Sequence, residues 1–240
     1  MAASSERLYD LGMRSFPWPS RVLITVVVGI LWVFSKLMWR WRMEDAAKLA
    51  PAPGATTGTV IICNHTSMAE VVAIYCHLFC AGRRVRPIAK SEFFKNGLIS
   101  WAFARAGAIP VDRGSADVRA LRCAQHALKR GEDVLIFPEG TRVRTDDQKV
   151  TVHGGYALMA QMAKAPIAPM AVCGWRDITP KGHHLMRPLT CWMRAGDQLS
   201  LSDAPSDLKR KERLAWLEHE GMARVYAIRD ELRREHPGRH

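Results

Sequence analysis

The chain has 240 residues, 48% of them hydrophobic and 24% charged, which suits one domain with a full hydrophobic core plus short appendages. An excess of 35 lysines and arginines over 23 aspartates and glutamates gives a formal net charge of +12, so we expect a polyanionic partner. No helix-turn-helix, zinc-finger or RNA-binding signature occurs. We therefore expect the partner to be anionic membrane lipid and not nucleic acid. The other interpretation is a basic surface that only keeps the protein soluble.

The first apolar stretch runs from Val22 to Phe34, just after Pro17-Trp18-Pro19. A spanning helix needs about 20 apolar residues; this run has 13, or 18 when it is counted to Trp39. Tryptophans and basic residues at its end are typical of an interfacial anchor: Trp32, Lys36, Trp39, Arg40, Trp41 and Arg42. We therefore predict a membrane-anchoring segment over residues 1–50, with no removable signal peptide. A helix within one leaflet, a true span and a buried core helix remain open.

Pro51-Ala52-Pro53-Gly54 marks a linker into a second segment, in which strand-like and helix-like patterns alternate. The predicted strands cover 59–63, 85–89, 108–111, 133–137 and 167–172, and the predicted helices cover 67–81, 93–106, 115–130 and 155–164. Such alternation predicts a single α/β domain over 51–205, with a largely parallel central sheet covered by helices.

The pattern weakens after residue 176, where 189–193 and 198–201 are candidate late strands. A charged helix is predicted over 207–234, within an amphipathic C-terminal segment 206–240. Its apolar side chains recur at helical spacing, which favours a docking face over a second membrane element. These residues are Leu214, Leu217, Gly221, Val225, Ile228 and Leu232.

The six cysteines are scattered and include no C-x-x-C pair, so we expect reduced and mostly buried thiols rather than a disulfide framework. His183 and His184 are adjacent instead of four residues apart on a helix, so the sequence predicts no metal site.

Asn64-His65-Thr66-Ser67-Met68-Ala69-Glu70 follows the first predicted strand. An imidazole titrates in the range needed to take a proton from a hydroxyl, so His65 is the candidate general base. Glu70 would bond the other ring nitrogen and stabilise the imidazolium. Two simpler roles compete with these: in one, His65 only bonds the backbone, and in the other, Glu70 serves Ser67 in a capping box. One carboxylate is not expected to serve both partners at full strength.

Phe137-Pro138-Glu139-Gly140-Thr141-Arg142 follows another predicted strand. Ligands bind at strand carboxyl ends in open α/β sheets, so two such loops would bring a base beside an anion clamp. That arrangement suits transfer of a group onto a hydroxyl of an anionic acceptor. Gly140 allows a positive φ or close approach of a ligand, and Glu139 either orients Arg142, contacts the acceptor or stabilises the turn. No G-x-S-x-G elbow occurs, so direct transfer is expected, with backbone amides or Asn64 stabilising the oxyanion.

These motifs resemble two blocks of the 1-acyl-sn-glycerol-3-phosphate acyltransferase family, NHxxxxD and FPEGT(R/S). Gly107-Ala108-Ile109-Pro110-Val111-Asp112-Arg113 and Ala165-Pro166-Ile167-Ala168-Pro169-Met170 are similar to two further blocks, so the resemblance covers roughly residues 55 to 175. It implies transfer of a fatty acyl group from acyl-CoA or acyl-ACP (acyl carrier protein) to the hydroxyl of a lysophospholipid, without a cofactor. The leading acceptor is 1-acyl-sn-glycerol-3-phosphate, giving phosphatidic acid, and the expected location is the cytoplasmic face of the cell membrane.

By this resemblance Arg113 and Arg142 hold the acceptor phosphate and Lys90 assists, while Asn64, Glu139, Gly140 and Thr141 belong to the substrate site. Two departures leave the acceptor open. Glu70 replaces the family's aspartate, as in the HxxxxE of acyltransferases that decorate lipid A, and His153 stands where family members often have lysine. Another lysophospholipid, a lyso-aminolipid or a glycolipid is the alternative acceptor, and a lipid-binding membrane protein is the alternative that is not an enzyme.

Overall fold

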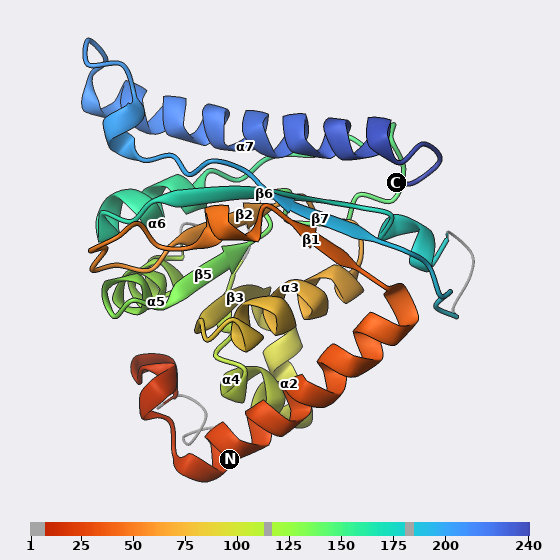
Figure 1. Ribbon diagram of the computed structural model, residues 1–240. Coiled ribbons are helices and arrows are strands. Elements are labelled where there is room, and N and C mark those ends of the chain that lie inside the picture. The colour runs from red at the N-terminus through yellow and green to blue at the C-terminus, as the bar shows by residue number, and fades with distance from the viewer. Residues whose placement is uncertain (1–7, 113–116, 181–184) are drawn as a thin grey trace.

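A seven-stranded sheet forms the centre of the computed structural model, which describes residues 8–112, 117–180 and 185–240 (Figure 1). In spatial order its strands are β1 (Arg42–Glu44), β7 (Trp192–Ala195), β6 (Ile167–Cys173), β2 (Val60–Cys63), β5 (Asp133–Ile136), β3 (Val85–Lys90) and β4 (Ile109–Val111). Every neighbouring pair is parallel except β6 with β7. The prediction of a largely parallel α/β sheet is confirmed.

Helices cover both faces of this sheet (Figure 1). They are α2 (Trp18–Trp39), α3 (Met68–Cys80), α4 (Gly97–Arg105), α5 (Val118–Lys129), α6 (Gly155–Ala163) and α7 (Arg210–Glu235). Short 3₁₀ helices are η1 (Met13–Ser15), η2 (Ala46–Leu49), η3 (Ser91–Lys95), η4 (Arg176–Ile178) and η5 (Leu201–Asp203). Ile61 and Cys63 of β2 face the core under α2 and α3, while Val60 and Ile62 face α5, α6 and α7. A strand buried on both faces is apolar throughout, which explains the continuous run in the sequence.

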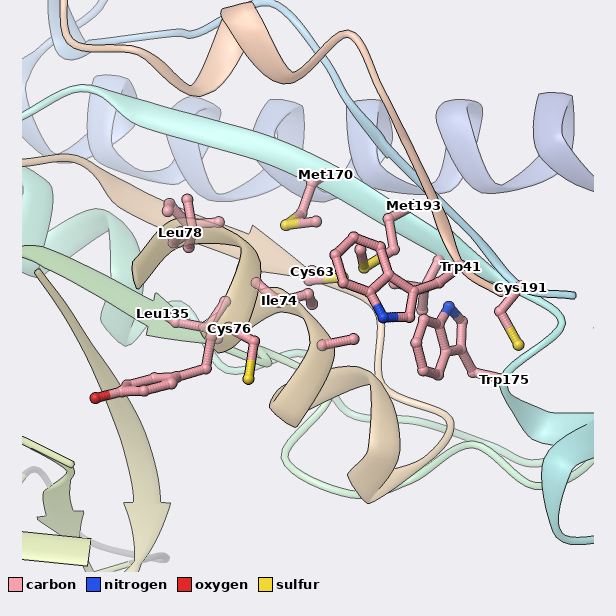
Figure 2. Close-up of a cluster of buried hydrophobic side chains, with 14 of the residues drawn as sticks. Trp41, Cys63, Ile74, Cys76, Leu78, Leu135, Met170, Trp175, Cys191 and Met193 are labelled. Atoms are coloured by element: carbon pink, nitrogen blue, oxygen red, sulfur yellow. The ribbon is translucent and has the colours of Figure 1, made fainter. Parts of the chain in front are cut away.

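The core between α3 and the sheet contains three tryptophans and several sulfur side chains, and Figure 2 shows part of it. Trp41 and Trp175 lie near Cys63, Met193 and Cys191 in this cluster. The cysteines of the described residues are free thiols, and four of the six are buried. Burial raises the pKa of another core thiol, Cys76, to about 12, so this sulfur packs as a neutral apolar group.

Three boundaries differ from the sequence prediction. The strand β1 lies inside the predicted anchoring segment 1–50, so that segment contributes to the sheet. The predicted helix over 93–106 is split into η3 and α4 because Asn96 caps α4, accepting bonds from the backbone of Leu98 and Ile99 at 3.0 and 3.2 Å. The stretch 198–201 forms no strand: Leu199 makes an isolated bridge with Ile167, and Leu201 begins η5.

Helix α2 carries the apolar N-terminal segment and is mostly uncovered. It packs on α3 through buried Val28, yet only 17% of its most apolar window is buried, which is inconsistent with a core helix. Its exposed apolar side chains include Val22, Val26, Ile30, Val33, Phe34 and Leu37. With 22 residues, α2 is long and apolar enough to cross a membrane. This exposed surface suggests membrane association.

Helix α7 lies across the opposite face, as its apolar stripe predicts (Figure 1). Leu217, Val225 and Leu232 are buried against the sheet. At Gly221 a Cβ atom would lie 2.9 Å from the Tyr156 hydroxyl and 3.1 Å from Ile62 Cδ1, so only glycine permits this close approach. The stripe is therefore a docking face, and it brings α7 to the ends of the central strands.

Candidate active site

The two sequence motifs meet at the carboxyl ends of β2 and β5, which are parallel neighbours in register from Val60–Val134 to Ile62–Ile136. The amide of Val143 donates to the His65 carbonyl at 2.7 Å, and the His65 amide donates to Glu139 Oε2 at 2.7 Å. The loop that carries Arg142 is therefore bound directly to the residue that carries the imidazole. The two loops lie side by side, as the sequence predicts.

His65 and Glu70 are in direct contact, with 2.7 Å between Nδ1 and Oε1. Glu70 belongs to the first turn of α3 and is completely buried, whereas the His65 side chain is 12% exposed. Because a carboxylate accepts hydrogen bonds, this contact assigns the hydrogen to Nδ1 and the lone pair to Nε2. Phe137 lies against the imidazole, with ring centroids 4.4 Å apart, and restricts its rotation.

The Glu70 carboxylate serves the imidazole and the helix cap together. Its Oε1 atom accepts from His65 and from the Thr66 amide at 2.7 Å, and Oε2 accepts from the Thr66 hydroxyl at 2.7 Å and the Ser67 amide at 3.0 Å. The expected competition between the two roles is absent, because two carboxylate oxygens offer about four acceptor positions. The cap instead holds the carboxylate rigidly beside Nδ1.

Glu139 stabilises the loop rather than orienting Arg142. It is 4% exposed; Oε2 accepts from the His65 amide, and Oε1 accepts from the Tyr226 hydroxyl at 3.2 Å. Burial raises the pKa of Glu139, and the bonds from His65 and Tyr226 oppose that shift. Tyr226 lies on α7, far along the chain from Glu139, so no local sequence pattern relates the two residues.

Asn64 bonds the neighbouring strand, and its role at the substrate stays a prediction. Its Nδ2 atom donates to the Val172 carbonyl at 3.2 Å, and its Oδ1 atom accepts from the Val172 amide at 2.9 Å. The residue is only 2% exposed. These two bonds to one backbone residue join the end of β2 to β6.

Gly140 closes the turn after β5. Its amide donates to the Phe137 carbonyl at 3.0 Å, and its φ of +62° is a conformation that favours glycine. A Cβ atom there would lie 3.0 Å from the ring of His153, whose backbone amide donates to the Pro138 carbonyl at 2.9 Å. The imidazole of His153 is therefore packed on this turn, at the position where family members often have lysine.

Arg142 and Thr141 are exposed, and no described residue pairs with the Arg142 guanidinium. The loop beyond it is nevertheless fixed: Arg176 contacts Asp146 at 2.9 and 3.2 Å, and Arg233 contacts it at 3.3 Å. The Arg176 guanidinium lowers the pKa of Asp146 to about 2. This loop thus carries an exposed guanidinium with no partner among the described residues, one residue before Val143, whose amide binds the His65 carbonyl.

Lys90 is less well placed than Arg142 to reach the site. Lys90 ends β3, which is separated from β2 by β5, and its Nζ atom already lies 2.6 Å from Glu92 Oε2. Arg113 lies outside the described residues, as do His183 and His184. Within the described ranges no group of three His, Cys, Asp or Glu side chains is arranged to hold a metal ion.

The sequence of this chain is similar to those of known acyltransferases. The sequence model of the family described as Acyltransferase matches residues 42–173. The 1-acyl-sn-glycerol-3-phosphate acyltransferase of Bacillus subtilis is 30% identical over 178 residues, covering 74% of this chain and 84% of that protein. The lyso-ornithine lipid O-acyltransferase of Pseudomonas aeruginosa is 35% identical over 95 residues, covering 39% and 36% of the two chains.

A similar fold occurs in the crystal structure of the 1-acyl-sn-glycerophosphate (LPA) acyltransferase from Thermotoga maritima. The TM-score is 0.64 at 21% sequence identity, and the match covers 86% of this chain and 80% of that one. At this level of identity the similarity is one of fold. It extends beyond the matched family region to include most of the chain.

Proposed function

This chain belongs to the acyltransferase family, and on that premise we propose that it acylates 1-acyl-sn-glycerol-3-phosphate to give phosphatidic acid. The acyl group comes from a thioester of coenzyme A or acyl carrier protein. The observation that carries the proposal is the contact between His65 and Glu70, at the end of the same strand whose neighbour supplies Arg142. The site thus combines an oriented base, His65, with an unpaired cation, Arg142.

In the proposed reaction, Nε2 of His65 takes the proton of the acceptor hydroxyl while its oxygen attacks the thioester carbonyl. Glu70 stabilises the imidazolium through Nδ1. When the C–S bond breaks, the leaving thiolate takes the proton from Nε2, so the base is regenerated. Arg142 and Arg113 hold the acceptor phosphate, and Lys90, already paired with Glu92, contributes less.

We place the reaction at the membrane because the acceptor is a lipid and α2 presents an exposed apolar surface. The cytoplasmic face is favoured because acyl thioesters are available there. The net charge of +12 supports attraction to anionic lipids at that face.

A second acceptor class is a lyso-aminolipid. Glu70 in place of aspartate and His153 in place of lysine both depart from the glycerophosphate pattern, and the Pseudomonas aeruginosa relative acts, by its name, on lyso-ornithine lipid. The absence of the lysine beside the turn favours this class, because a lysine there would add a permanent positive charge for a phosphate.

The acceptors are distinguished by incubating purified protein with a mixed pool of lysolipids and acyl thioesters and identifying the products by mass spectrometry. We expect phosphatidic acid as the main product. A higher kcat/KM for lyso-ornithine lipid would replace the leading acceptor with the second. Lysolipid binding without consumption of any thioester would instead support a lipid-binding protein.

Replacing Arg142 by alanine is expected to raise KM for the phosphate acceptor about 10- to 100-fold, because a hydrogen bond to a charged group contributes about 1.5–3 kcal/mol. The matched control is Lys149→Ala, which removes one exposed and unpaired charge from the same loop. With a phosphate-free acceptor, steady-state kinetics should show an unchanged KM for the Arg142→Ala variant. An equal loss with both acceptors would contradict the phosphate role of Arg142.

A further inference from the structure

A basic cavity lies where β3 and β5 begin, at the opposite end of the strands from His65. Its volume is about 440 Å³, within the usual range of small-molecule sites. Four arginines and two acids are among its lining residues: Arg14, Arg83, Arg84, Arg130, Glu132 and Asp133. Four positive charges against two negative ones leave an excess of two positive charges in this lining.

Both acids are already satisfied by protein donors. Asp133 accepts from Arg83 at 2.6 and 2.7 Å and from the Thr59 amide at 2.9 Å. Glu132 accepts from Arg86 at 2.7 Å and from Arg130 at 3.3 Å. Two of the four arginines are therefore neutralised within the wall of the cavity.

Arg14 and Arg84 have no carboxylate partner among the described residues. The Arg84 guanidinium lies over the Phe79 ring, 4.6 Å from its centroid, and donates to the Arg83 carbonyl at 3.2 Å, so its position is defined. Burial lowers the pKa of Arg84, and the positive charge of Arg14 lowers it further. Like charges held together without a counter-ion favour binding of an anion.

We propose that this cavity binds a phosphate-bearing anion through the guanidinium groups of Arg14 and Arg84. Planar guanidinium groups match phosphate oxygens in geometry as well as in charge. The site is separate from the proposed reaction centre, since it lies at the amino ends of the strands whose carboxyl ends carry the catalytic loops.

The phosphate has two possible sources, a lipid headgroup and a soluble phosphate compound. Arg14 belongs to η1, which precedes α2 by only two residues, and Trp18 and Arg21 are exposed at the start of α2. Indoles and basic side chains at that position suit the headgroup region of a bilayer. A lipid phosphate would thus lie within reach of the cavity when α2 is in the membrane.

The test uses full-length protein in the Arg142→Ala background, so that the proposed acceptor site does not contribute to binding. The Arg14→Ala, Arg84→Ala double variant is compared with an Arg210→Ala, Lys211→Ala control, which removes two exposed charges from the start of α7. Calorimetry with inorganic phosphate and pyrophosphate tests the soluble source. Co-sedimentation with phosphatidylcholine vesicles, with and without phosphatidylglycerol, tests the lipid source.

We expect affinity for a phosphate probe to fall about tenfold or more in the cavity variant and to stay unchanged in the control. Loss of pyrophosphate or phosphate binding identifies a soluble ligand, and loss confined to phosphatidylglycerol vesicles identifies a headgroup. An equal loss of affinity in the cavity and control variants, or no loss of affinity in either assay, would overturn the proposal. Because Arg14 is exposed, the single Arg14→Ala variant provides the same comparison if the double variant does not fold.

Discussion

Replacing His65 by alanine is expected to lower kcat about 10²- to 10⁴-fold, the usual contribution of a general base. The imidazole is oriented on two sides, by Glu70 at 2.7 Å and by the ring of Phe137, and no described residue bonds its Nε2 atom. Water could enter the space left by the side chain, but it would not supply the basic ring nitrogen that Glu70 orients. Thioester consumption with the acceptor present measures this loss.

The fold of the His65→Ala variant should survive. The buried carboxylate of Glu70 loses one donor but retains the Thr66 amide, the Thr66 hydroxyl and the Ser67 amide, so the free energy of unfolding falls by about 1 kcal/mol. His126→Ala, an exposed histidine on α5, is the matched control and should keep full activity. Near-normal turnover by His65→Ala would remove the proposed mechanism.

Replacing Glu70 by glutamine is expected to lower kcat about 100-fold or more and to reduce stability as well. The amide nitrogen of glutamine is a donor, and it would face either the imidazole or the backbone amide groups that the carboxylate now serves. One buried donor is then left unpaired, at a cost of about 1–3 kcal/mol in the free energy of unfolding. Thermal denaturation and steady-state kinetics measure the two effects on the same sample.

Ser67→Ala separates the two roles of Glu70. The Ser67 hydroxyl accepts from the Ala69 amide at 3.2 Å, so its removal weakens the helix cap by about 1 kcal/mol without touching the imidazole. We expect a lower melting temperature and unchanged kcat. If Glu70→Gln behaves in the same way, Glu70 is only a capping residue.

Much of the architecture follows from the sequence because it depends on local pattern. Alternating strand and helix segments predicted the parallel sheet, and the apolar stripe from Leu214 to Leu232 predicted the docking face of α7. The pairing of His65 with Glu70 was also predicted, since both lie within one strand end and the first turn of the following helix. The split at Asn96 was missed because one capping side chain outweighed a continuous helical pattern.

Tertiary structure alone decided which polar side chains remain available. Asn64 and Glu139 both occur in motifs that suggest contact with substrate, yet one is paired with Val172 and the other with His65 and Tyr226. The same holds for Arg84 and Arg14, whose unpaired charges meet only when η1 is packed beside the starts of β3 and β5. The sequence determined the chemistry of each side chain and its local position, whereas partners distant in the chain depend on strand order and helix packing, for which no local pattern exists.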